Sequence, residues 1–236
     1  MIPLRDNAPI HSLPFATWGL IALNAIVFFY ELTLPDPALD QFYLQYAMIP
    51  GKLAHGENLL TPLTCMFLHG GWLHIIGNMW SLYLFGDNVE DRLGSVRFVI
   101  FYLLCGLAAN LTHFAAQPES MVPTLGASGA IAGVMGAYVV LFPRAQVLTL
   151  VPIVIFVTII EIPAVVFLGI WFVMQLLSGL LSAGDKVAYE GVAWWAHVGG
   201  FATGILLLPI FVPPRPRQST IKYEDWPVAD ESYHPW

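Results

Sequence analysis

The stretch that decides the fold is VAWWAHVGGFATGILLLPIFV, residues 192–212. It carries no charged residue, and roughly 20 apolar helical residues are enough to cross the hydrocarbon core of a bilayer. Similar or shorter apolar runs cover Phe15–Leu34, Trp72–Phe85, Val96–Ala116, Ser128–Arg144 and Ile162–Ser182. Of the 236 residues, 57% are hydrophobic and 11% charged, which excludes a soluble domain. The sequence predicts an all-α fold, a polytopic membrane helical bundle with six transmembrane helices.

The polar segments divide the chain into a membrane domain and two tails. Residues 1–14 hold two prolines before the first apolar run and match a cleavable signal peptide poorly, so we expect a retained cytoplasmic tail. The membrane domain covers residues 15–212, and residues 213–236 form a Pro-rich cytoplasmic tail that we expect to be mobile. Within the domain, Pro35–Gly71 is expected to be a structured loop in the interface, and Gly86–Gly94 a charged turn.

Charge placement decides how to treat Val147–Ile160, which is apolar but short for a span and contains Pro152. If this segment does not cross, both termini lie on one side, and only Lys52 and Lys186 fall on the other. The basic residues on the side of the termini are Arg5, Arg92, Arg97, Arg144, Arg215, Arg217 and Lys222. That bias favours cytoplasmic termini, with Val147–Ile160 as an interfacial or re-entrant piece.

Two polar side chains, His74 and Asn78, lie four residues apart in an apolar segment, on one face of a helix. Polar groups in membrane segments are candidates for function because their burial is costly unless they are paired or solvated. The alternative is a polar pair that joins two helices, which is common in bundles.

The cysteines Cys65 and Cys105 fit neither a metal site nor a disulfide framework, and we expect two unpaired apolar side chains.

Ser128 and His197 each begin a helix face made of small residues. Gly129 and Gly133 follow Ser128 with the spacing that allows close helix contact, and Gly200 and Gly204 share a face with His197. Taken alone, Ser128 reads as a helix N-cap and His197 as a structural histidine with one partner. If the two glycine faces pack together, however, they bring a hydroxyl and an imidazole into contact, which is the pairing that activates a serine nucleophile.

Four motifs occur in an order that resembles the rhomboid family of intramembrane serine proteases. They are HGGWLHIIGN at residues 69–78, GDNVEDRLG at 86–94, GASGAIAG at 126–133 and AHVGGFATG at 196–204. The resemblance covers residues 60–204, which is most of the membrane region. It implies a serine endopeptidase that hydrolyses transmembrane-anchored proteins near the outer membrane surface. It also implies membrane lipids as surroundings, and no cofactor, metal, nucleic acid or obligate partner.

The same resemblance implies roles for individual residues. Ser128 would be the nucleophile and His197 the general base, without an acid, and the oxyanion donors would be His74, Asn78 and the backbone N–H of Ser128. As supporting residues, Gly126 and Gly129 would allow tight backbone around the nucleophile. His69 would also support the site, and a water-facing loop histidine is an equal alternative. The minimal six-span core resembles the bacterial type, so we expect a bacterial cytoplasmic membrane.

Two departures from the family pattern stand out. Residues 60–64, LTPLT, lack the Trp-Arg pair that many members carry in the first loop. Ala132 stands where some members place an aromatic residue under the base, which leaves the orientation of His197 open.

Three other classes of protein remain as alternatives. The first is a catalytically silent relative that binds transmembrane helices without cutting them. The second is a metalloprotease with His69, His74 and His197 as ligands, although the sequence has no HExxH motif. The third is a transporter or channel, whose polar groups would have to line a path between both faces.

Overall fold

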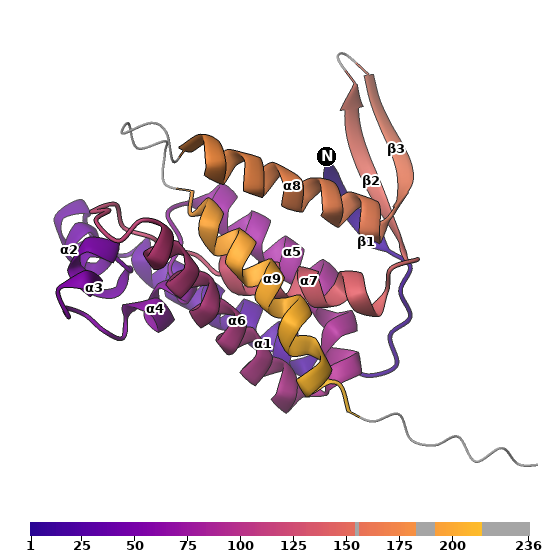
Figure 1. Ribbon diagram of the computed structural model, residues 1–236, viewed down its shortest axis with the longest axis horizontal. Coiled ribbons are helices and arrows are strands. Elements are labelled where there is room, and N and C mark those ends of the chain that lie inside the picture. The colour runs from indigo at the N-terminus through magenta and orange to yellow at the C-terminus, as the bar shows by residue number, and fades with distance from the viewer. Residues whose placement is uncertain (154–155, 183–191, 214–236) are drawn as a thin grey trace, which may run out of the picture.

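A computed structural model describes residues 1–153, 156–182 and 192–213 of the chain, and most of these residues are helical (Figure 1). The long helices are α1 (Phe15–Glu31), α5 (Trp72–Leu93), α6 (Ser95–Ala116), α7 (Ser128–Leu141), α8 (Ala164–Ser182) and α9 (Trp194–Phe211). Short helices between α1 and α5 are α2 (Asp36–Tyr46), α3 (Pro50–Ala54), α4 (Thr61–Thr64) and the 3-10 helix η1 (Cys65–Phe67). The expected loop at 35–71 is therefore structured. The expected tail at 213–236 lies outside the described residues except for Pro213.

Helix α7 forms the centre of the bundle. All its residues from Gly129 to Tyr138 are buried, and α5, α6, α8 and α9 all contact it. With 14 residues and a rise of about 1.5 Å each, α7 is about 21 Å long, which is shorter than the ~30 Å hydrocarbon core. A helix surrounded by other helices does not need the length or the apolar exterior of an isolated span.

Helices α7 and α9 touch through their glycines, as their sequence patterns predict. A Cβ atom built on Gly200 would lie 2.0 Å from the carbonyl oxygen of Gly129, and one built on Gly204 would lie 1.9 Å from that of Gly133. In the reverse direction, a Cβ on Gly136 of α7 would lie 2.3 Å from the carbonyl oxygen of Phe201 of α9. Only hydrogen fits at these positions, so the backbones of α7 and α9 are in direct contact.

The segment Gly86–Gly94, expected to be a charged turn, continues helix α5 instead, and that expectation was wrong. The carboxylate of Glu90 is buried and accepts hydrogen bonds from Thr17 N and Oγ1 at 2.7 and 2.8 Å and from Ser95 Oγ at 2.6 Å. These donors belong to the first turns of α1 and α6. They take the place of water around the carboxylate of Glu90, so this charged stretch does not need to form a solvent-exposed turn. The chain turns only at Gly94, whose φ of +81° suits glycine.

A small antiparallel sheet with the strand order β1-β2-β3 corrects the all-α expectation. Strand β1 (Ile2–Asp6) comes from the segment that we expected to be a tail, and it pairs with β2 (Gln146–Ile153). Strand β2 pairs in turn with β3 (Phe156–Pro163), so these two antiparallel strands cover most of Val147–Ile160, and its interfacial or re-entrant placement stays a prediction. The run is rich in Val, Ile and Thr, which favour strands over helices.

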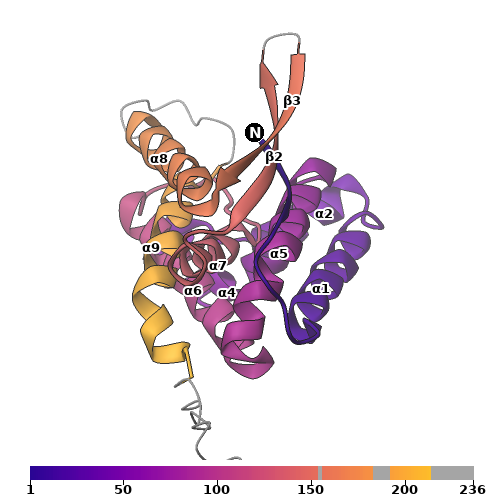
Figure 2. The same cartoon turned by 90° about the vertical axis from the view of Figure 1, so that its right-hand side faces the viewer.

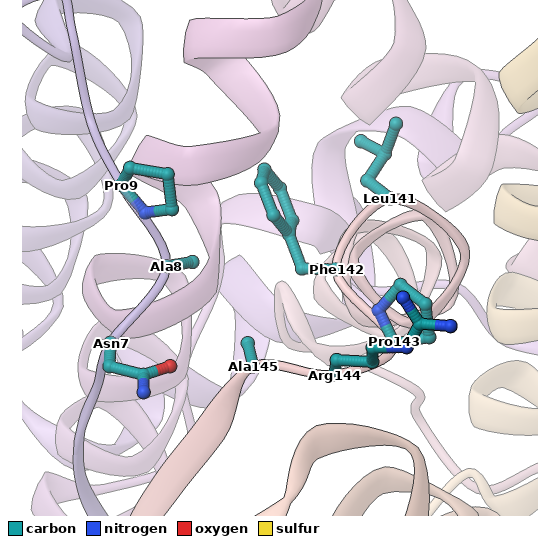
Figure 3. Close-up of a pocket in the computed structure, with 8 residues that line it drawn as sticks. All are labelled: Asn7, Ala8, Pro9, Leu141, Phe142, Pro143, Arg144 and Ala145. Carbon is teal, nitrogen blue, oxygen red and sulfur yellow. The ribbon is translucent and has the colours of Figure 1, made fainter.

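The N-terminal segment is fastened to the bundle beyond this strand pairing. The indole N–H of Trp80 donates to the carbonyl of Pro3 at 2.7 Å, the amide of Asn88 donates to the carbonyl of Ala8 at 3.2 Å, and Tyr138 donates to the carboxylate of Asp6. Figure 2 shows this segment running across α5 toward the hairpin. Figure 3 shows residues 7–9 facing residues 141–145 across a small pocket of about 270 Å³ at the end of α7. Residues 1–14 are therefore an ordered part of the fold.

The helices differ in whether their length and composition suit a membrane span. Among the described residues, three helices are long and apolar enough to cross a membrane: Ser95–Ala116, Ala164–Leu181 and Trp194–Phe211. Helices α1 and α7 are apolar but shorter, and α5 carries Asp87, Glu90, Asp91 and Arg92 in its last turns. The six-span arrangement stays a prediction.

Candidate active site

A cavity of about 510 Å³ lies at the end of α7 where its first residue, Ser128, is found. Residues from α5, α6, α7 and α9 line it, together with the segments directly before α7 and α9. His74, Asn78, Ser128 and His197 are all among them, so the cavity brings together residues that stand far apart in the sequence. Figure 1 shows that this end of α7 points toward α2, α3 and α4, away from the start of the hairpin.

Ser128 and His197 are in direct contact. The Oγ atom of Ser128 lies 2.7 Å from Nε2 of His197, across the glycine contact between α7 and α9. Ser128 is the first helical residue and Ala127 holds the cap position, so the simple N-cap interpretation of Ser128 was wrong. A serine hydroxyl held by an imidazole nitrogen at this distance has the geometry of a nucleophile with its base.

The other ring nitrogen of His197 also has a partner. Its Nδ1 atom lies 2.7 Å from Oε1 of Gln175, a side chain of α8. The imidazole ring lies 5.8 Å from the ring of Trp171, also on α8, and 6.3 Å from the ring of Trp194. With two polar partners, His197 is not a structural histidine with one partner. The aromatic contact that Ala132 cannot supply comes from a different helix.

His74 and Asn78 line the cavity from α5, next to the glycine that precedes the nucleophile. A Cβ atom on Gly126 would lie 2.6 Å from Nε2 of His74 and 3.6 Å from Nδ2 of Asn78. The φ of Gly126, +122°, also lies in the region that favours glycine. Nδ2 of Asn78 is buried and has no hydrogen-bond partner among the residues that the structure describes. A polar pair joining two helices would have satisfied that donor.

Among the supporting glycines, Gly129, Gly200 and Gly204 all lie in the contact between α7 and its neighbours. A Cβ on Gly129 would lie 2.7 Å from the Cβ of Ala109 on α6. These glycines therefore set how closely α6, α7 and α9 approach, and through that distance they set the separation of Ser128 from His197.

His69 is fully buried, so the water-facing alternative was wrong. Its ring packs against that of His74 with centroids 5.1 Å apart, and its backbone N–H donates to the carboxylate of Glu31 at 3.2 Å. Burial, together with the neighbouring His74, lowers the pKa of His69 to about 4, so its ring is neutral at neutral pH. His69 packs behind His74 and is not among the residues that line the cavity.

Several polar residues near the site were not singled out in the sequence. Asn110 of α6 lines the cavity and donates to the carbonyl of Pro62 at 2.7 Å and to Sγ of Cys65 at 3.1 Å. Gln175, Asn110 and Glu31 are each a polar side chain inside or at the end of an apolar run, and that pattern alone could have marked them.

Cys65 and Cys105 are both free and buried, as predicted.

Comparison with known proteins identifies the family. The model of the Rhomboid domain matches residues 56–214. A Bacillus subtilis protein named putative rhomboid protease YdcA is 32% identical over 55% of this chain and 63% of its own length. Rhomboid protease GluP of the same organism is 35% identical over 57% of this chain and 26% of its own length. The mitochondrial RHOMBOID-like protein 6 of Arabidopsis thaliana is 29% identical over 66% of this chain and 45% of its own length.

The chain spans about half the length of several rhomboid-like relatives from Arabidopsis thaliana that it matches. The matched region contains α5 to α9 and with them every residue that lines the cavity. The order of the motifs agrees with the family match, and the chain belongs to the rhomboid family.

Proposed function

We propose that this protein is an intramembrane serine endopeptidase that hydrolyses transmembrane-anchored proteins with Ser128 and His197. The observation that carries the proposal is the 2.7 Å contact between Ser128 Oγ and His197 Nε2 at the wall of a cavity. Relatives whose names identify them as rhomboid proteases, including YdcA and GluP, support the assignment. Family membership and the apolar helices make the chain an integral membrane protein.

The chemistry follows from the contact. Nε2 of His197 takes the hydroxyl proton as Ser128 Oγ attacks the scissile carbonyl carbon, which gives a tetrahedral oxyanion. The C–N bond then breaks, His197 returns the proton to the leaving amine, and an acyl ester remains on Ser128. Water, activated by the same imidazole, hydrolyses the ester and regenerates the serine. A cavity of about 510 Å³ leaves room for that water beside the nucleophile.

The oxyanion requires donors that are aimed before the reaction begins. Nδ2 of Asn78 is a buried donor without a partner in the described part of the chain, and it faces the same cavity as Ser128. Leaving a buried donor unpaired costs about 1–3 kcal/mol, and an oxyanion formed in the reaction would relieve that cost. His74 Nε2 lies beside it against Gly126, and the backbone N–H of Ser128 points outward from the first turn of α7.

A metalloprotease is less well supported by the same geometry. Within residues 1–153, 156–182 and 192–213, no group of three His, Cys, Asp or Glu side chains converges as a metal site. His69 packs behind His74, and His197 is already held by Ser128 and Gln175. The hydroxyl, and not a metal, is the group that these contacts prepare for attack.

The membrane arrangement that we propose has six spans with cytoplasmic termini. The site then opens on the opposite side, because Ser128 begins α7 and Arg144 follows its end. A substrate segment would reach Ser128 below the outer surface of the membrane. A bacterial cytoplasmic membrane stays our prediction, since the relatives include a mitochondrial plant protein.

The direct test of the proposed function is labelling by a fluorophosphonate, which reacts with activated serines. We expect the folded protein in liposomes to be labelled and to cleave a membrane-tethered reporter, and we expect heat-denatured protein to do neither. A folded protein that is neither labelled nor active on a range of tethered helices would point to the catalytically silent relative.

Replacing Asn78 by alanine should slow the reaction without preventing it. The loss of one oxyanion donor costs about 10²-fold or more in kcat in soluble serine proteases, and we expect a loss of about that size or somewhat less, because other donors remain. KM should change little, since the donor acts in the transition state. Asn88→Ala is the matched control, because Asn88 lies on the same helix but bonds Ala8. Equal kcat values for Asn78→Ala and wild type would remove Asn78 from the oxyanion site.

The hairpin gives a test of the membrane arrangement. It extends away from the bundle, across the direction of α7 and α8 (Figure 1), and it exposes Val157, Ile159 and Ile160. We expect a spin label at Val157→Cys in liposomes to collide more often with oxygen than with a water-soluble nickel complex. Glu57→Cys, in an exposed loop, should give the opposite order. Both native cysteines are buried, so labelling is selective. A water-dominated signal at residue 157 would contradict an interfacial hairpin.

A further inference from the structure

Gln175 is the buried polar residue of α8, the helix on the outside of the bundle (Figure 1). Its neighbours Val173, Met174 and Leu177 are 50–57% exposed, whereas Gln175 is 8% exposed. The amide therefore points inward, toward α9, while these three apolar side chains face outward. A buried amide in an apolar helix is costly unless it has a partner, and its partner here is His197.

We propose that Gln175 is a positioning residue that fixes which ring nitrogen of His197 carries the proton. The inference rests on the proposed function of Ser128 and His197. Oε1 of an amide can only accept a hydrogen bond, so Nδ1 of His197, 2.7 Å away, must donate. In a neutral imidazole with its proton on Nδ1, the lone pair is on Nε2. That nitrogen, 2.7 Å from Ser128 Oγ, is then ready to accept the hydroxyl proton.

Trp171 completes the arrangement one turn earlier on the same helix. It lies four residues before Gln175, hence on the same face of α8, and its ring packs over the imidazole at 5.8 Å. The ring contact restricts the tilt of the imidazole, and the hydrogen bond restricts its rotation. Helix α8 thus supplies the orientation that the small Ala132 cannot supply from α7.

A neutral amide suits this place better than a carboxylate. Apart from Gln175 itself, the contacts of the His197 ring away from Ser128 are with the aromatic rings of Trp171 and Trp194, and an ionised acid there would need further donors to offset its desolvation. The amide oxygen fixes the tautomer without burying a charge. It also lies opposite the positive charge that develops on the ring during attack, and its dipole favours that charge.

Three variants in liposomes test the inference, with kcat and KM for a tethered reporter as readouts. Gln175→Met keeps the length of the side chain but removes the acceptor, and we expect kcat to fall about tenfold, the loss of one hydrogen bond, with KM within about twofold. Gln175→Glu restores an acceptor of equal reach and should recover part of the lost kcat, although burial of its charge is costly at this place. Met174→Leu, on the outward face, should leave both constants unchanged.

A wild-type kcat in Gln175→Met overturns the inference, and so does an equal loss in Gln175→Met and Gln175→Glu, which would indicate packing alone. Failure of the proposed function is a different result, in which wild type and Ser128→Ala behave alike. In that case, or if Gln175→Met does not fold, nitrogen NMR of wild-type protein with labelled histidines tests the inference by showing which ring nitrogen of His197 carries the proton. We expect His197 to carry its proton on Nδ1, and a proton on Nε2 in the neutral ring would overturn the inference.

Discussion

Replacing Ser128 by alanine is expected to reduce cleavage of a tethered substrate by about 10⁴-fold or more, which places the variant below detection in most assays. The hydroxyl is the only group that the contact with His197 prepares for attack. His197→Ala should have an effect of the same size, and the double variant should be no worse than either single one, because a nucleophile and its base act as a unit. Fluorophosphonate labelling should vanish in parallel.

The control for this prediction is Ser81→Ala. Ser81 is a serine of helix α5, and its hydroxyl donates to the carbonyl of Gly77 in the same helix. We expect Ser81→Ala to keep wild-type cleavage and labelling. If Ser128→Ala keeps near-wild-type cleavage while the protein is folded and the reporter is intact in its absence, another residue performs the attack and the proposed pair is wrong.

The pairing of Ser128 with His197 could be predicted because the sequence marks both residues in the same way. Each residue begins a face of small residues, and two such faces pack more closely than any others. The glycine contacts between α7 and α9 follow directly from that spacing. Gln175 could not be paired in the same way. Its helix meets α9 through large side chains, Trp171 and Phe172, and such contacts leave the register open.

The errors in the fold have a common physical origin, since each concerns a segment whose neighbours decide its structure. A charged stretch such as Gly86–Gly94 is usually solvated, but Glu90 is satisfied by donors from α1 and α6. The apolar run Val147–Ile160 has no alternation that would separate a buried strand from a short helix. Its hairpin is completed by β1, and nothing within residues 1–14 specifies the distant strand that it joins.

Gly204→Ala is expected to have the largest effect on the fold itself. The new Cβ would lie 1.9 Å from the carbonyl oxygen of Gly133, which belongs to the backbone and cannot rotate away. Helices α7 and α9 must then move apart by roughly 1 Å. A gap of about that size removes a large part of the van der Waals attraction between the atoms that were in contact. Overpacking of this kind costs about 3 kcal/mol. We expect a lower thermal unfolding midpoint in detergent than for wild type.

The same displacement should appear in catalysis, because the glycine contact sets the distance between Ser128 and His197. Misplacement of catalytic groups by about 1 Å can cost about 10²-fold in rate, and we expect a kcat loss of that order in the Gly204→Ala protein that remains folded. Gly19→Ala is the matched control, since no described atom lies within 4 Å of a Cβ at Gly19 in helix α1. It should keep wild-type kcat and gain slightly in stability from the higher helix propensity of alanine. Equal unfolding midpoints and kcat values for the two variants would show that α7 and α9 do not approach as closely as the glycine contact requires.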